Sequence, residues 1–185
     1  MSRVTLHTLQ SAPEAAKPFL ENAQKASGFI PNLLAVLANA PAALETYVTV
    51  SGLNGKSELS LAEREVVQLV AATTHGCDFC VAGHTAVALN KAKLPDEVVS
   101  ALREQATLPQ EKLEVLAAFA REVIATRGKV SDSTFNTFKA AGYTEGNALE
   151  VILGVSLATL CNFANVFADT PLNPELARYG VKLGQ

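Results

Sequence analysis

Two cysteines and a histidine stand close together in the segment EREVVQLVAATTHGCDFCVAGH, residues 63–84. Cys77 and Cys80 form a C-x-x-C pair, and across the first turn of a helix this spacing lets the two sulfur atoms reach disulfide distance. The free N–H groups and the dipole at such a helix start favour a thiolate at Cys77. His84 follows Cys80 by four residues, so on a helix both side chains lie on one face, where the imidazole can take or stabilise the thiol proton. The pattern indicates a thiol pair that cycles between reduced and disulfide forms.

Glu65 adds a carboxylate from the preceding segment. It falls on one helical line with Leu61, Leu69 and Ala72, so it lies on an apolar stripe. Burial there raises the pKa of a carboxyl group toward neutrality, which suits a proton shuttle beside a thiol. A glutamate at a subunit boundary, or one paired with a lysine, would give the same pattern. Because the C-x-x-C-x-x-x-H motif follows closely, we favour the interpretation of Glu65 as a proton shuttle.

Two consecutive helices must position these residues. Ser60 and Glu63 form a capping box, in which the serine hydroxyl and the glutamate carboxylate satisfy free backbone N–H groups at a helix start. The first helix is expected over about 60–75, where Gly76 can end it, and the second over about 77–91. The thiol pair therefore lies at the junction of the two helices.

The remaining chain also divides into helical lengths, and no window shows the period-2 alternation of β-branched residues that is typical of strands. Proline and glycine mark the starts and stops of these helices. We expect helices over about 11–28, 29–39, 41–53, 109–128 and 131–142, a short helix from residue 95 and a long one from residue 144. The chain is predicted to be all-α, with residues 1–185 forming a single domain.

Residues 151–168 carry no charge, and this length is close to that of a membrane span. Polar side chains recur through the stretch, no basic residues flank it, and Asp169 closes it directly. We interpret it as a fully buried helix, packed in the core or between subunits, and expect no membrane insertion.

A weak internal repeat appears when residues 65–84 are set against 150–169, with five identities in twenty positions. A repeat of this kind implies two helical halves of related shape, about 1–92 and 93–185. Only the first half has the two cysteines and the histidine of the motif.

Composition narrows the classes of function. The chain is 49% hydrophobic and only 18% charged, with a surplus of Ala, Val and Leu, which suits close helix packing and a surface partly covered by other subunits. The net charge is −3 and no basic cluster is interleaved with aromatic residues, so no nucleic-acid partner is expected. The N-terminus does not have the pattern of a secretory signal, so a cytoplasmic, reducing compartment is expected. There, a close cysteine pair more often indicates redox chemistry or metal binding than a structural disulfide.

The motif resembles that of the AhpD-like alkylhydroperoxidases of the carboxymuconolactone decarboxylase superfamily, with a glutamate twelve residues before C-x-x-C and a histidine four residues after it. The runs FIPNLLAVLANAP upstream and EVILGVSLATLCNFANVFA downstream are similar to the peroxidase-related branch. The resemblance implies an all-helical fold with duplicated halves and assembly into homo-oligomers, either trimers or hexamers. It also implies reduction of hydroperoxides in antioxidant defence by a cysteine pair, without haem, metal or other cofactor.

Carried over to this chain, the resemblance makes Cys80 the peroxidatic thiolate and Cys77 the resolving cysteine, which together form the disulfide. His84 and Glu65 become the proton relay. Attack on the peroxide leaves a sulfenic acid, the second thiol condenses with it, and an external dithiol or protein thiol resets the pair. The chain departs from the pattern at Phe79, where some members have a histidine. An apolar ring there replaces a polar contributor to the site.

Two other interpretations of the motif stay open. Cys77, Cys80 and His84 can supply three zinc ligands, with His75 or Glu65 as a fourth, although the chain has no second C-x-x-C. The pair can also sense oxidation and alter assembly without peroxidase turnover. A c-type haem needs a histidine directly after the second cysteine, and a thioredoxin-like protein needs βαβ patterning; both are missing.

Four further polar residues have less specific interpretations. Cys161, inside the uncharged stretch, is interpreted as an inert buried thiol. His75 is either an accessory site residue or simply the end of its helix. Asn162 and Asn165 stand where the repeat aligns the two cysteines, and they are interpreted as helix-to-helix hydrogen bonders.

Overall fold

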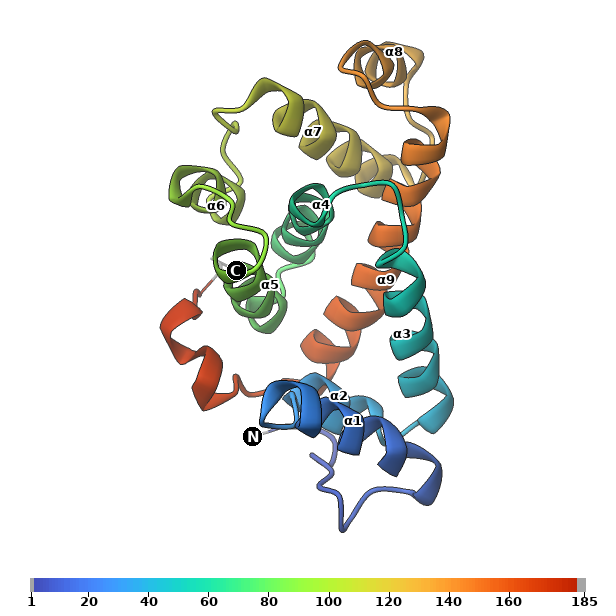
Figure 1. Cartoon of the computed structure of the whole chain (residues 1–185), viewed down its shortest axis with the longest axis vertical. Coiled ribbons are helices and arrows are strands. Elements are labelled where there is room, and N and C mark those ends of the chain that lie inside the picture. The colour runs from blue at the N-terminus through green and yellow to red at the C-terminus, as the bar shows by residue number, and fades with distance from the viewer. Residues whose placement is uncertain (1, 183–185) are drawn as a thin grey trace.

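The computed structural model of the chain describes residues 2–182, and within that range it contains helices and no strands (Figure 1). This confirms the all-α prediction. The elements in chain order are η1 (Glu14–Ala16), α1 (Lys17–Ser27), α2 (Asn32–Leu37), α3 (Pro41–Asn54), α4 (Leu61–Thr74), α5 (Asp78–Asn90), α6 (Asp96–Arg103), α7 (Glu111–Thr126), α8 (Asp132–Ala140), α9 (Glu145–Ala168) and η2 (Pro174–Tyr179).

Helix boundaries lie close to where the capping and turn residues predict them. Ser60 Oγ accepts the Glu63 N–H while the Glu63 carboxylate accepts the Ser60 N–H, so the predicted capping box starts α4. Gly76 takes a positive φ of 67°, a conformation that suits glycine, and turns the chain from α4 into α5. Helix α2 is shorter than the predicted 29–39, because Pro31 at its N-cap holds the preceding residues out of the helical region. The 3-10 helix η2 was not expected.

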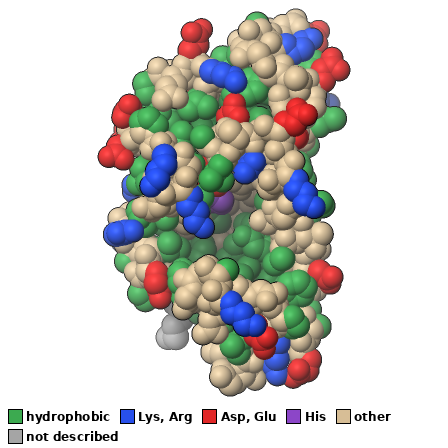
Figure 2. Space-filling model, in the orientation of Figure 1, with side chains coloured by type: hydrophobic (Ala, Val, Ile, Leu, Met, Phe, Trp, Pro, Cys, Tyr) green, Lys and Arg blue, Asp and Glu red, His purple; other side chains and the backbone are tan. Residues whose placement is uncertain are grey.

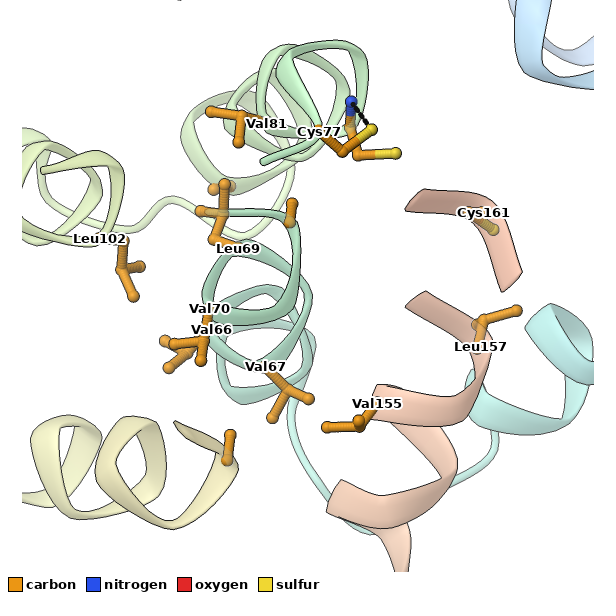
Figure 3. Close-up of a cluster of buried hydrophobic side chains, with 14 of the residues drawn as sticks. Val66, Val67, Leu69, Val70, Cys77, Val81, Leu102, Val155, Leu157 and Cys161 are labelled. Atoms are coloured by element: carbon orange, nitrogen blue, oxygen red, sulfur yellow. Dashed lines mark hydrogen bonds between the residues drawn. The ribbon is translucent and has the colours of Figure 1, made fainter. Parts of the chain in front are cut away.

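Helix α4 lies at the centre of the fold and packs against α5, α6, α7 and α9. Every residue from Glu65 to Thr73 is buried. The crossing with α9 is close, because a Cβ atom on Gly154 would come within 3.1 Å of Val67 Cγ1. Figure 3 shows Val67 of α4 and Val155 of α9 directed toward each other across this contact. Glycine at position 154 therefore allows α9 to lie close to α4.

Helix α9 is long and apolar enough to cross a membrane by length and composition, and half of its most apolar window is buried inside the fold. The single chain therefore buries only part of the helix, and full burial stays a prediction that requires contact between subunits. One side packs against α2, α3 and α4, as a core helix of a soluble protein does. The other side leaves Leu149, Phe163 and Phe167 57–69% exposed. This apolar outer face has no cover within residues 2–182.

One continuous cluster of buried hydrophobic side chains extends from Ala12 to Cys161 and joins the two predicted halves. The division into halves at about residue 92 stays a prediction.

Candidate active site

Cys77 and Cys80 lie at the start of α5. Cys77 is the N-cap residue, and its Sγ accepts the backbone N–H of Cys80 at 3.3 Å, a contact drawn in Figure 3. The Cys77 N–H in turn donates to the carbonyl of Ala72 near the end of α4, which fixes the pair at the junction of the two helices. Both cysteines are buried free thiols, so the structure holds the reduced pair.

The two thiols differ strongly in acidity. A hydrogen bond from the Cys77 thiol lowers the pKa of Cys80 to about 7; burial opposes this, and the charge of His84 and two amides assist it. The same hydrogen bond, together with burial, raises the pKa of Cys77 above its ordinary value. The expectation that the helix start makes Cys77 the thiolate is therefore corrected. The N–H of Cys80 does favour a Cys77 anion, but the proton shared by the pair stays on Cys77.

Glu65 and His84 form a part-buried ion pair beside the thiols. Glu65 Oε2 lies 2.8 Å from His84 Nδ1, and the carboxylate comes from α4 while the imidazole comes from α5. Burial disfavours the imidazolium, but the charge and hydrogen bond of Glu65 outweigh it and raise the pKa of His84. With Nδ1 held by Glu65, Nε2 is the nitrogen left to exchange a proton with other groups.

Two amides from α9 reach the Cys80 sulfur. Asn165 Nδ2 donates to Cys80 Sγ at 3.2 Å, and the Asn162 side chain also lowers the pKa of Cys80 by hydrogen bonding. Asn162 Oδ1 accepts the Nδ1–H of His75 at 3.0 Å, which leaves the amide nitrogen of Asn162 free to face the thiolate. Both asparagines are almost completely buried.

These two asparagines are the site residues that sequence reasoning missed, since it interpreted them only as helix-to-helix hydrogen bonders. Their alignment with the two cysteines in the weak repeat was the signal that pointed to them. His75 fits both of its open interpretations, because it is the C-cap of α4 and also holds Asn162.

A cavity of about 440 Å³ opens beside Cys80 and is walled mostly by apolar side chains. Figure 2 shows the hollow on the face in view, with a histidine at its floor. Its lining includes Glu65, Cys80 and His84 together with Phe29, Leu33, Leu34, Tyr47, Arg64, Gln68, Phe79, Val87, Leu157, Cys161 and Leu176.

Tyr47 and Cys161 also line this cavity. Burial, reinforced by the neighbouring acidic groups of Cys161, Cys80 and Glu65, raises the pKa of Tyr47, so its phenol stays a neutral hydrogen-bond donor that faces the site. Burial likewise raises the pKa of the Cys161 thiol. Cys161 is therefore a buried, protonated thiol, but it lies in the cavity wall instead of deep in the core. Phe79 lies there too, so its ring contributes to the apolar lining.

A zinc site was the main alternative interpretation of the motif, and residues 2–182 contain no matching set of ligands. No three His, Cys, Asp or Glu side chains converge there as ligands of one ion. His84 and His75 each have one ring nitrogen committed, to Glu65 and to Asn162. The geometry therefore gives no support to a zinc site built on the C-x-x-C motif.

Residues 41–122 match the family model of the carboxymuconolactone decarboxylase family. This range covers α3 to α7 in part or whole and contains Glu65, Cys77, Cys80 and His84. No curated protein sequence matches the chain at a significant level.

Solved structures share the fold over nearly the whole chain. A peroxidase-related protein from Ralstonia eutropha JMP134, described as an alkylhydroperoxidase AhpD core, is 22% identical with a TM-score of 0.84, covering 95% of this chain and 94% of its own. A peroxidase-related protein from Silicibacter sp. TM1040 is 19% identical with a TM-score of 0.79, covering 94% of each chain. A cysteine-to-alanine variant of the debrominase Bmp8, in complex with 2,3,4-tribromopyrrole, is 16% identical with a TM-score of 0.78, covering 97% of this chain and 96% of its own.

The fold and the partial family match point in the same direction. The chain has the fold of AhpD-like proteins, and residues 41–122, which hold the thiol pair, match the carboxymuconolactone decarboxylase family. The same fold is found in the debrominase Bmp8 as well as in the two peroxidase-related proteins.

Proposed function

We propose that the protein is a thiol-dependent hydroperoxide reductase that acts in antioxidant defence in the cytoplasm. One observation carries the proposal: the pKa of Cys80 is lowered to about 7, and its side chain lines a cavity while the protonated thiol of Cys77 lies in hydrogen-bond contact. A thiolate that is populated at neutral pH, has room for a substrate and has a second thiol beside it meets the needs of two-cysteine peroxide reduction.

The first step is attack of the Cys80 thiolate on the terminal oxygen of ROOH. An S–O bond forms, the O–O bond breaks, and the RO⁻ leaving group takes a proton to become ROH. His84, held as the imidazolium by Glu65, is the proton donor, so the pair acts as the relay. The sulfur of Cys80 is oxidised to the sulfenic acid and the peroxide is reduced.

In the second step the Cys77 thiol attacks the sulfenic sulfur. The S–S bond forms, the S–O bond breaks, and water leaves with the thiol proton. An external dithiol or protein thiol then reduces the disulfide by two exchange steps and is itself oxidised. Each turnover converts ROOH and a dithiol into ROH, water and a disulfide.

Peroxide-dependent oxidation of a dithiol donor tests this function. We expect turnover in the wild type, loss to background in Cys80→Ser, and a Cys77→Ser variant that stops after one reaction with a sulfenic acid trapped on Cys80. Cys161→Ser is the matched control and should keep turnover. Sulfenic acid on Cys77 in the Cys80→Ser variant, with none in Cys77→Ser, would reverse the two roles. Since a solved relative is a debrominase, 2,3,4-tribromopyrrole serves as the competing substrate, and its turnover without any peroxide turnover would overturn the proposal.

The apolar outer face of α9 supports a second part of the proposal, a homo-oligomer. Leu149, Ile152, Phe163, Val166 and Phe167 are 39–69% exposed and recur along one long helix. Contiguous exposed apolar residues of this kind mark interaction surfaces. We propose that further copies of the chain cover them, in a trimer or hexamer.

A further inference from the structure

We propose that Arg64 binds a carboxylate on the substrate, so that the preferred substrate is an organic hydroperoxide with an anionic group remote from the peroxide. This inference rests on the proposed function and names the substrate class of the same site.

Arg64 brings an unpaired positive charge to the cavity. It lines the cavity on α4, next to Glu65, among mostly apolar walls. One guanidinium nitrogen donates to the carbonyl of Leu59, which holds the side chain in place. Within residues 2–182 no carboxylate forms an ion pair with it. The remaining donors of the planar guanidinium match the geometry of a carboxylate.

Two carboxylates near Arg64 in the sequence or the fold have other partners. Glu65 uses Oε2 for His84. Glu150 accepts the backbone N–H groups of Glu58 and Leu59 on the segment before α4. A charge that is part-buried, fixed by one hydrogen bond and left without a counter-ion fits an anion supplied by the ligand.

Arg64 and the reacting sulfur line the same cavity from two helices, since Arg64 belongs to α4 and Cys80 to α5. The guanidinium is directed back to Leu59, before the start of α4, whereas Cys80 lies in the first turn of α5. The carboxylate and the hydroperoxide of the substrate would therefore lie at separate points of one cavity, joined by a body that contacts its apolar walls.

The surface around the opening agrees with an anionic ligand. In Figure 2, Lys and Arg side chains gather along the edge of the hollow above the histidine. Basic side chains at the mouth of a cleft with apolar walls attract anions toward it. Hydrogen peroxide has neither an apolar group nor a charge, so it would contact neither the apolar walls nor Arg64 in the way an anionic organic hydroperoxide does.

A matched pair of hydroperoxides tests the inference: a hydroperoxy fatty acid and its methyl ester, which differ only in the charge. We measure kcat/KM for both with the wild-type protein and a dithiol donor, and the readout is the acid-to-ester ratio. We expect the wild type to prefer the acid by about tenfold or more, as for a charge-assisted hydrogen-bonded pair. Arg64→Leu should bring the ratio close to one, and Arg64→Lys should keep an intermediate ratio because it retains the charge without the fork.

The control is Lys25→Leu, which removes an exposed charge on α1 outside the cavity and should keep the wild-type ratio. The rate at which iodoacetamide alkylates Cys80 is measured in every variant, to show that the thiolate is intact. Equal kcat/KM for acid and ester in the wild type would overturn the inference and leave the proposed function standing. Absence of turnover with either hydroperoxide, while Cys80 still alkylates, would overturn both.

Discussion

Asn165 and Cys80 occupy equivalent positions in the weak internal repeat, and the structure places them in contact, with Asn165 Nδ2 3.2 Å from Cys80 Sγ. The amide from the second half donates to the thiolate of the first. Among residues 2–182, the buried Asn165 Oδ1 finds no hydrogen-bond partner. A buried polar atom without a partner costs stability. We therefore infer that the role of Asn165 is to donate to the Cys80 sulfur and not to stabilise the fold.

Replacing Asn165 with leucine, which has nearly the same shape, removes this donor. We expect the pKa of Cys80 to rise by about one to two units, since a hydrogen bond to a charged group contributes roughly 1.5–3 kcal/mol. The rate of peroxide reduction at neutral pH should fall several-fold. Thiolate absorbance as a function of pH measures the pKa, and urea unfolding checks that the fold is kept. A wild-type pKa in a folded Asn165→Leu variant would contradict the role of the amide.

Glu65→Gln tests the ion pair with His84 through its pH dependence. Because Glu65 raises the pKa of His84, the imidazolium persists to higher pH in the wild type than in a variant without the charge. Activity needs the Cys80 thiolate, which appears as pH rises through about 7, and the His84 imidazolium, which is lost as pH rises further. In Glu65→Gln the loss on the alkaline side should begin at lower pH, and peak turnover should fall by about tenfold or more.

The same pair affects stability, and the sign follows from the raised pKa of His84. Its contribution is fully present below the pKa of an unfolded histidine, about 6.5, and is lost as pH rises through the higher folded value. Unfolding free energies of wild type and Glu65→Gln should therefore differ more below this window than above it. A pH-independent difference, with an unchanged activity profile, would mean that Glu65 does not hold His84 as the cation.

Charges placed on the outer face of α9 test the homo-oligomer. We expect the wild type to have a multiple of the 19.5 kDa chain mass by light scattering, and Phe163→Glu combined with Phe167→Glu to lower that mass. The carboxylates would have to be desolvated in an interface, which costs several kcal/mol per ion. Thr46→Glu, on the exposed part of α3, is the control and should keep the wild-type mass. A monomeric wild type at micromolar concentration would contradict the proposal.

Gly154 allows α9 to lie close to α4, so a larger side chain should separate them. Gly154→Leu is expected to lower the free energy of unfolding by about 1–3 kcal/mol, because its side chain would overlap Val67. Gly52→Ala in α3 is the matched control: nothing lies within 4 Å of its added Cβ, and better helix propensity should stabilise by about 0.5–1 kcal/mol. Urea unfolding measures both. Equal effects of the two changes would show that the α4–α9 contact tolerates expansion.

Local signals predicted most of the fold. The capping box at Ser60, the prolines and the glycines act within a few residues of the chain, so the helix boundaries followed from them. The exposure of α9 did not follow, because an uncharged helix has the same composition whether its second face meets the core, solvent or another subunit. The weak repeat aligned Asn165 with Cys80, but it did not predict that the two side chains touch.

Part of the candidate site could also be predicted from local spacing, and part could not. Cys77, Cys80 and His84 lie within two turns of one helix, so spacing alone predicted their proximity, and the helical stripe of Glu65 added the carboxylate. Which thiol keeps the proton depends on hydrogen bonds between helices, and spacing could not predict it. Arg64 belongs to the site because it lines the cavity, which residue spacing does not predict. The asparagines were indicated only by their alignment with the two cysteines in the weak repeat.

Because Cys77 caps α5, the backbone amide of Cys80 is expected to respond to the oxidation state of the cysteine pair. In the reduced protein its sulfur accepts the N–H of Cys80 and satisfies one free group of the helix start. A disulfide draws that sulfur toward Cys80 Sγ and changes the acceptor seen by the amide. We expect the first turn of α5 to fray and re-form with each turnover, so hydrogen exchange at the Cys80 amide can follow the redox state without a label.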